Sequence, residues 1–138
     1  MAAMKFTRAE DKLIGESGQA GGGPVDPSPL TGIWLNTDKR TGGITKLVLT
    51  QNDGGLMVRA FGACDPAPCD WGEVRGEAFS SGVGSPEGMA FTVSYQFGFM
   101  ETFLAVYFKG GILVLDSFNT FNDDSGRSNY FSREFFHN

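Results

Sequence analysis

Eight short runs of apolar residues lie between Leu30 and Asn138, and glycine-rich or polar turns separate them. Within most runs apolar and polar positions alternate with a period of two, which is typical of half-buried β-strands. The turns are short and local, so consecutive strands should pair antiparallel. The strands are expected at approximately 31–37, 44–51, 56–62, 71–78, 89–97, 100–109, 112–121 and 130–137.

Eight strands are about the number that closes into a small barrel holding side chains or one ligand. The sequence therefore predicts an all-β protein, an eight-stranded antiparallel up-and-down β-barrel over residues 30–138. The alternation also predicts the side chains that face inward. In the strand at 89–97 these are aromatic or β-branched, whereas the strand at 71–78 offers small residues between charged ones. Such an asymmetric interior suits a pocket, although the same pattern also suits a solid core.

The strands at 100–109 and 112–121 are apolar on both faces. One face of the first holds Phe103, Ala105 and Tyr107, and the other holds Thr102, Leu104, Val106 and Phe108. Only one face can line a barrel, and the pattern leaves open which. The other must meet the N-terminal segment, a partner subunit or solvent. An apolar sheet face of that size usually marks an interface, so we predict a homo-oligomer, in the first place a homodimer.

Residues 1–29 form a separate N-terminal segment. Thr7-Arg8-Ala9-Glu10 fits a capping box and predicts a short helix from about Arg8 to Ile14. The glycine- and proline-rich stretch 18–29 has the composition of a linker. Two interpretations stay open, a disordered tail and a tethered lid over one mouth of the barrel.

The net charge of the chain limits the classes of partner that it can bind. Acidic residues outnumber basic ones by 16 to 11, which gives a net charge of −5. This excess argues against a nucleic acid and against an anionic membrane surface, because both need a basic patch. The first 15 residues carry several charges and lack the apolar core of a secretory signal, and no run is long enough for a membrane span. We expect a cytoplasmic protein.

Cys64 and Cys69 flank the loop Asp65-Pro66-Ala67-Pro68 between two predicted strands. A zinc site would need a second ligand pair, and the only histidine, His137, lies far along the chain, so no metal site is predicted. Structural free cysteines, a disulfide and a redox pair remain the alternatives.

Four side chains are candidates for acid, base or hydrogen-bonding roles if the barrel is an enzyme: Tyr95, Glu101, Tyr107 and Asp116. A carboxylate buried among apolar residues would have a raised pKa and would suit proton transfer. No Ser-His-Asp set, phosphate-binding loop or dinucleotide fingerprint occurs, so no cofactor is expected.

The run Leu30-Thr31-Gly32-Ile33-Trp34-Leu35-Asn36 and the strand Met89–Phe97 resemble segments of the calycin superfamily, of avidins in particular and lipocalins more generally. The resemblance implies that Trp34 closes one end of the barrel and that Arg133, on the last strand, packs across it. It also implies ligand contacts by Asn36 and Tyr95. Avidins surround biotin with several tryptophans, whereas this chain has two, so the resemblance bears on the fold more than on the ligand.

The first functional hypothesis is a barrel that binds a small hydrophobic or planar metabolite in its interior. The second is a cofactor-independent cyclase or isomerase that acts on a hydrophobic metabolite in the same cavity. The third is a structural interaction module with a filled core. The residues expected to contact a ligand are Trp34, Asn36, Phe91, Tyr95, Phe97, Phe103 and Asn119.

Overall fold

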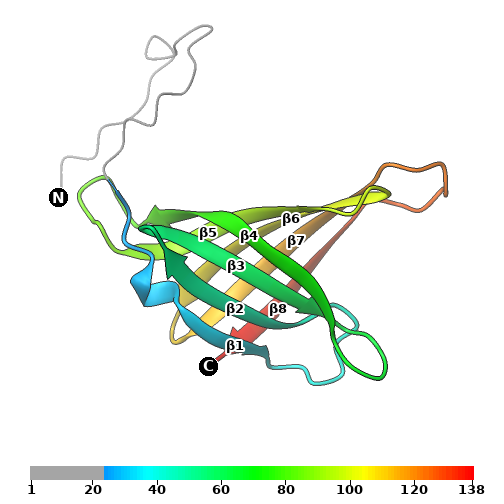
Figure 1. The fold of residues 1–138 in the computed structure, drawn as a ribbon, viewed down its shortest axis with the longest axis horizontal. Coiled ribbons are helices and arrows are strands. Elements are labelled where there is room, and N and C mark those ends of the chain that lie inside the picture. Colours follow the sequence, from blue (N-terminus) through cyan, green and yellow to red (C-terminus); the bar gives the residue numbers. More distant parts are fainter. Residues whose placement is uncertain (1–23) are drawn as a thin grey trace, which may run out of the picture.

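In the computed structural model, which describes residues 24–138, eight antiparallel strands close into one barrel in the order of the sequence (Figure 1). A 3₁₀ turn, η2, precedes them at Ser28–Leu30. The strands are β1 (Gly32–Asn36), β2 (Ile44–Asn52), β3 (Gly55–Gly62), β4 (Cys69–Ser80), β5 (Gly88–Gln96), β6 (Met100–Lys109), β7 (Ile112–Phe121) and β8 (Tyr130–His137).

The predicted fold class is confirmed, and each strand begins and ends within two residues of its expected position. The turns explain why the strand bounds could be predicted, because turn dipeptides that contain glycine or asparagine leave little freedom for where a hairpin reverses. Asp53 and Gly54 have positive φ angles of 53° and 77°, as a tight hairpin turn requires. The helix expected over residues 8–14 and the two interpretations of the N-terminal segment lie outside the described residues.

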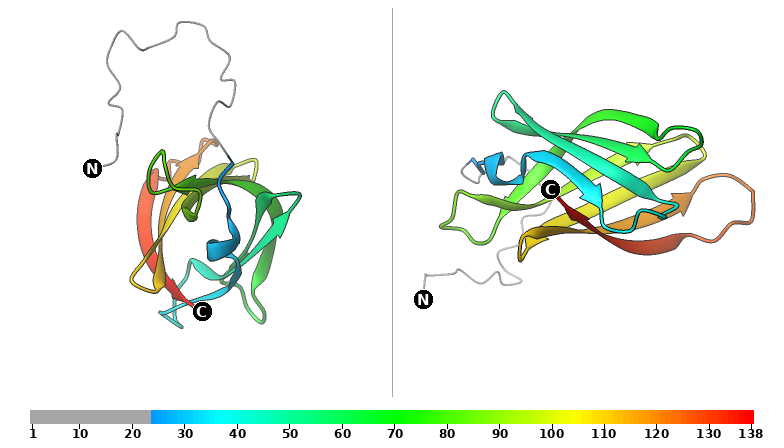
Figure 2. Two further views of the ribbon diagram at one scale, coloured as in Figure 1. Left: turned by 90° about the vertical axis from the view of Figure 1, so that its left-hand side faces the viewer. Right: turned by 90° about the horizontal axis from the view of Figure 1, so that it is seen from below.

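The strands pair over many residues around most of the barrel, but the first and last strands, which close it, pair over only a few. β6 and β7 pair over ten residues, whereas β1 and β8 pair only through Leu35 with His137 and Asn36 with Phe136. β4 pairs with β5 only from Glu77 onwards, so the first half of β4 belongs to the β3 side alone. Viewed along the barrel, the ring of strands is complete and η2 lies across one opening (Figure 2).

The core fills the barrel at the end that η2 covers. Leu30 of η2 is fully buried, and its carbonyl oxygen accepts a hydrogen bond of 3.0 Å from the Trp34 indole Nε1. Phe108 packs edge-on against the same indole at 5.9 Å between ring centroids. Apolar side chains from seven of the strands complete this core, among them Leu47, Leu49, Leu56, Val58, Phe91, Leu104, Leu115 and Phe136.

Candidate functional site

Trp34 closes one end of the barrel, but Arg133 does not pack across it. The Arg133 guanidinium lies on the outside and binds both oxygens of Asp116, at 2.6 and 3.0 Å. The residue of β8 that turns inward next to Arg133 is Glu134, because neighbouring residues of a strand point to opposite faces. The place given to Arg133 by the resemblance was therefore wrong.

Tyr95 crosses the interior from β5 to the opposite strands. Its hydroxyl accepts a hydrogen bond of 3.1 Å from the Ala60 N–H and lies 3.0 and 3.2 Å from the carbonyl oxygens of Gly72 and Val58. Burial raises the pKa of Tyr95 to about 12, so the phenol stays protonated at neutral pH. The hydroxyl joins β5 to β3 and β4 where the β4–β5 ladder has ended.

Two aromatic rings surround Tyr95 and occupy the space beside it. Trp71 meets Tyr95 edge-on at 5.3 Å between centroids, and Phe97 stacks on Tyr95 at 6.1 Å. Gly62 makes room for Trp71, since a Cβ at that position would lie 2.6 Å from the indole nitrogen. Phe91, another aromatic residue expected to contact a ligand, is 1% exposed in the apolar core.

Asn36 is also buried, but its hydrogen bonds hold the β1–β2 loop. Its Nδ2 donates to the Ile44 carbonyl and to a Glu134 carboxylate oxygen, each at 2.9 Å, and its Oδ1 accepts from the Asp38 N–H at 2.7 Å. Glu134 in turn accepts hydrogen bonds from the Thr41 hydroxyl and the Ile44 N–H. The pairing of Asn36 with Glu134 therefore fastens the loop to the last strand.

Asn119 belongs to a second buried polar network, made of side chains from β6, β7 and β8. Its Oδ1 accepts from the Thr102 hydroxyl at 2.8 Å, and its Nδ2 donates to the Ser117 hydroxyl at 3.1 Å. The Ser117 hydroxyl also lies 2.7 Å from that of Ser132. Together these bonds tie three neighbouring strands from the inside.

Among the described residues, every buried side-chain nitrogen and oxygen has a hydrogen-bond partner. The three polar residues expected to contact a ligand, Asn36, Tyr95 and Asn119, are thus each hydrogen-bonded to other groups of the protein. An interior ligand would have to break these bonds and displace aromatic rings, and leaving a buried polar group unpaired costs about 1–3 kcal/mol. The arrangement gives the interior a structural role.

The remaining candidates lie on the outside of the barrel. Glu101, Phe103 and Tyr107 share the outer face of β6, and Asp116 lies on the outer face of β7. Phe103, expected to line the interior, is 39% exposed there. The inward face of β6 is the other one, which holds Leu104 and Val106, because γ-branched and β-branched side chains fill the narrow interior. Tyr95 is the one catalytic candidate that the barrel encloses.

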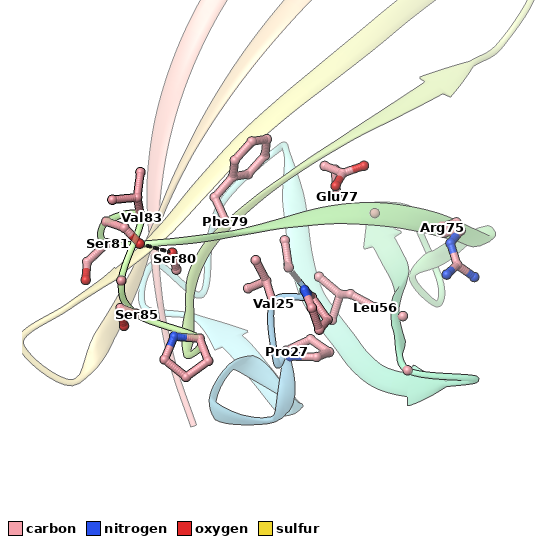
Figure 3. A pocket seen from close by; sticks show the side chains of 18 residues that line it. Val25, Pro27, Leu56, Arg75, Glu77, Phe79, Ser80, Ser81, Val83 and Ser85 are labelled. Carbon is pink, nitrogen blue, oxygen red and sulfur yellow. Dashed lines mark hydrogen bonds between the residues drawn. The ribbon is translucent and has the colours of Figure 1, made fainter. Parts of the chain in front are cut away.

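An open cleft of ≈ 1060 Å³ lies beside the barrel, between residues 24–27, the β2–β3 turn and the 80–86 loop (Figure 3). Val25 and Pro27 face Leu56 across it, while Arg75 and Glu77 lie farther along its β4 side. A smaller cavity of ≈ 370 Å³ follows the gap where β4 and β5 separate, next to Phe103. Both open on the outside of the barrel, and neither gathers a set of convergent polar groups.

The cysteines form a disulfide, so of the alternatives left open the structure selects this one. The bond closes the β3–β4 loop. Asp70, next to Cys69, accepts three hydrogen bonds from Arg59 of β3, two of 3.1 Å and one of 2.5 Å, and this bonding holds the pKa of the Asp70 carboxyl below its usual range. No cluster of three or more metal-ligating side chains occurs within residues 24–138.

The outer face of β6, β7 and β8 carries three rows of three residues, which we call the aromatic wall. The strand register aligns each row across the three strands. The rows are Phe103, Phe118 and Phe131; Ala105, Asp116 and Arg133; and Tyr107, Val114 and Phe135.

Four phenylalanines give the aromatic wall its exposed apolar surface. Phe103, Phe118, Phe131 and Phe135 are 39–50% exposed. The first three rings contact one another along their row, at 6.4 Å and 5.2 Å between successive centroids. Contiguous apolar surface on this scale usually marks an interface in a soluble protein.

Asp116 and Arg133 form the only ion pair of the aromatic wall. They lie directly opposite each other on β7 and β8, and the hydrogen bonds that Arg133 donates to the Asp116 carboxylate raise the pKa of the Arg133 guanidinium. The Arg133 side chain also lies 5.8 Å from the centre of the Phe131 ring. A partner that covers the phenylalanines therefore also meets one negative and one positive group.

No protein-family model, no curated protein and no solved structure matches the chain. Within the described residues, no helix is long and apolar enough to cross a bilayer.

Proposed function

We propose that this barrel is a protein-interaction module whose aromatic wall docks against another protein surface. The observation that carries the proposal is the contiguous exposure of Phe103, Phe118 and Phe131 on neighbouring strands, with Phe135 in the same face. The interior supports an interaction module with a filled core, because its polar groups are hydrogen-bonded within the protein and its apolar groups are packed. Of the hypotheses drawn from the sequence, this is the interaction module.

The exposed area of the four phenylalanines is large enough to matter for binding. A phenylalanine offers about 150–250 Å² of surface, so four rings that are nearly half exposed present roughly 350 Å². Covering that area would yield about 9 kcal/mol before other terms, at about 25 cal/mol per Å². Association itself costs on the order of 4–15 kcal/mol, so the phenylalanines and their surroundings support binding of moderate affinity.

Binding of a metabolite in the interior and cyclase or isomerase chemistry there remain the alternatives, and no contact in the barrel favours them. The calycin-like assignment is also part of the proposal. Gly32-x-Trp34 at the start of β1 and the burial of Trp34 under η2 support it. A cytoplasmic location stays a prediction, and the disulfide, which is typical of oxidising compartments, weighs against it.

Site-specific photo-crosslinking in cells tests the docking role. A photoreactive phenylalanine analogue replaces Phe118 in one strain and Glu73, an exposed residue on the outer face of β4, in a matched control strain. We expect a discrete protein adduct at position 118 that is absent at position 73. No adduct at 118, or the same adducts at both positions, would overturn the proposal.

A further inference from the structure

We infer that the occupant of the aromatic wall is a second copy of this chain, in a dimer whose two-fold axis lies in the interface. The axis runs parallel to the strands, midway between β7 and β8. The inference rests on the proposed docking role of the wall and goes beyond it by naming the partner and the geometry.

The row pattern of the wall is complementary to itself under this axis. A two-fold axis parallel to the strands places each row at the level of the same row of the partner and exchanges β7 with β8. The residues of β7 and β8 then face one another, and those of β6 lie at the edge of the contact. Phe118 then meets the partner's Phe131, so exposed rings cover each other. The partner's Phe135 lies over the position of Val114, which is only 6% exposed in the single chain. Face-to-face packing of this kind is the arrangement of two sheets in a sandwich.

The charges of the wall favour this axis over a two-fold axis that runs across the strands. In the middle row Asp116 would face the partner's Arg133, and Arg133 would face the partner's Asp116. The four groups then form a ring in which every neighbour has the opposite sign. An axis running across the strands would instead place Asp116 on Asp116 and Arg133 on Arg133, and like charges brought together in an interface oppose association.

Self-complementarity is the property that an isologous interface needs, since both sides are the same patch. A different protein would fit the wall only if it repeated the same pattern of two apolar rows around a pair of opposite charges. The wall as a whole is electrically neutral, with Asp116 and Arg133 as its only charged residues, whereas the full chain carries a net charge of −5. The neutral face is thus the one on which two acidic chains meet without mutual repulsion.

Charge reversal across the axis tests the inference through heterodimer formation. Asp116→Arg gives a wall with two positive groups, and Arg133→Asp gives one with two negative groups. We expect each single variant to be monomeric at concentrations where the unaltered chain is dimeric. An equimolar mixture of the two variants should form a heterodimer, because each positive group then faces a negative one. Native mass spectrometry distinguishes the heterodimer by its mass, and sedimentation velocity measures the affinity.

Two controls separate assembly from folding. Circular dichroism and thermal unfolding show whether each single variant keeps the barrel, since both substitutions also break the pair within one chain. The double variant Asp116→Arg with Arg133→Asp restores opposite charges both within and between chains, and it should dimerise on its own. A merely structural role for the pair would restore folding in the double variant but would give no heterodimer in the mixture.

The outcomes are decisive for the inference. A monomeric wild-type chain, folded single variants that dimerise like the wild type, or a mixture that stays monomeric would each overturn the two-fold dimer. Such a result leaves the proposed function standing if photo-crosslinking at position 118 yields an adduct with a different protein. The absence of any adduct, by contrast, contradicts the docking role itself.

Discussion

Two outer walls of the same barrel differ in the kind of residue that they expose. The outer face of β3 and β4, the charged wall, carries Arg59, Asp70, Glu73, Arg75 and Glu77 and one exposed phenylalanine, Phe79, near its end, whereas the aromatic wall carries four exposed phenylalanines. A barrel needs only its inner face to close and pack, so the fold does not require phenylalanine on the outside. The difference therefore indicates a function for the aromatic wall.

The charged wall shows how this chain keeps a sheet face soluble. Arg59 and Asp70 pair with each other, and the Lys46 ammonium lies 4.5 Å from the centre of the Phe61 ring and shields it. The aromatic wall has one ion pair, Asp116–Arg133, between two apolar rows, and within residues 24–138 only Phe131 among its phenylalanines lies next to a charged group. We expect self-association to depend on the aromatic wall and not on the charged wall.

The largest effect is expected from removing two rings of the aromatic wall. Phe118→Ser combined with Phe131→Ser should weaken self-association by at least about 100-fold, because central aromatic residues contribute about 2 kcal/mol or more each to an interface and 1.4 kcal/mol is tenfold. Sedimentation equilibrium measures the change. Val83→Ser, at an apolar residue that is 81% exposed in the β4–β5 loop, is the control and should leave association unaltered. Equal association by both variants would remove the distinction between the walls.

The next largest effect is expected from a substitution in the interior, which should lower stability without changing dimer affinity. Tyr95→Phe leaves the Ala60 N–H without its partner and the facing carbonyl oxygens of Val58 and Gly72 without a donor. We expect a loss of about 2 kcal/mol in the free energy of unfolding, measured with urea, since buried unpaired groups cost about 1–3 kcal/mol. Dimer affinity measured under native conditions should be unchanged. A matching loss of affinity would show that the outer face depends on the interior polar groups.

A smaller effect is expected from alkaline pH. Burial raises the pKa of Tyr95 to about 12, while the phenol of the unfolded chain titrates near 10. Above about pH 10 the unfolded chain releases a proton that the folded chain keeps, so stability should fall as the pH rises towards 12. A loss of about 1–2 kcal/mol is expected, because one pKa unit corresponds to about 1.4 kcal/mol. If Tyr95→Phe shows the same decline, then Tyr95 is not the group responsible.

The smallest effect is expected on the charged wall. Arg59→Ala removes the partner of Asp70, but both side chains are more than 40% exposed and exposed ion pairs contribute little. Self-association should change by less than about threefold, since charges outside an interface mainly alter rates of encounter. A change in affinity comparable to that of the phenylalanine variants would show that the charged wall takes part in docking.

Much of the aromatic wall can be predicted from the sequence, but the alignment of its β8 residues cannot. The two-residue turn Gly110-Gly111 sets the β6–β7 register, which places Phe103 opposite Phe118. The pattern could not decide which face of β6 points outward, because both faces are apolar. The segment 122–129 between β7 and β8 is longer and leaves their register free, so the alignment of Phe131 with Phe118 came only from the structure.

The interior networks depend on closure of the barrel in space. Glu134 meets Asn36 across 98 positions of sequence, and Tyr95 reaches a backbone amide 35 positions away. No local pattern marks Glu134, whose neighbours in sequence include charged and aromatic residues alike. The alternation within β8 places Glu134 on the same side as Phe136, but nothing in the sequence says that the carboxylate would meet Asn36.

The most direct measurement is a residue-resolved NMR comparison of the chain across concentrations, from roughly 1 µM, where weak dimers dissociate, to 1 mM, where they form. The dimer predicts concentration-dependent amide shifts at residues 103–107, 114–118 and 131–135, with none along β3 and the first half of β4. Shifts that spread evenly over the barrel, that cluster on the charged wall, or that never appear would contradict the assignment of the aromatic wall as the docking face of a second copy.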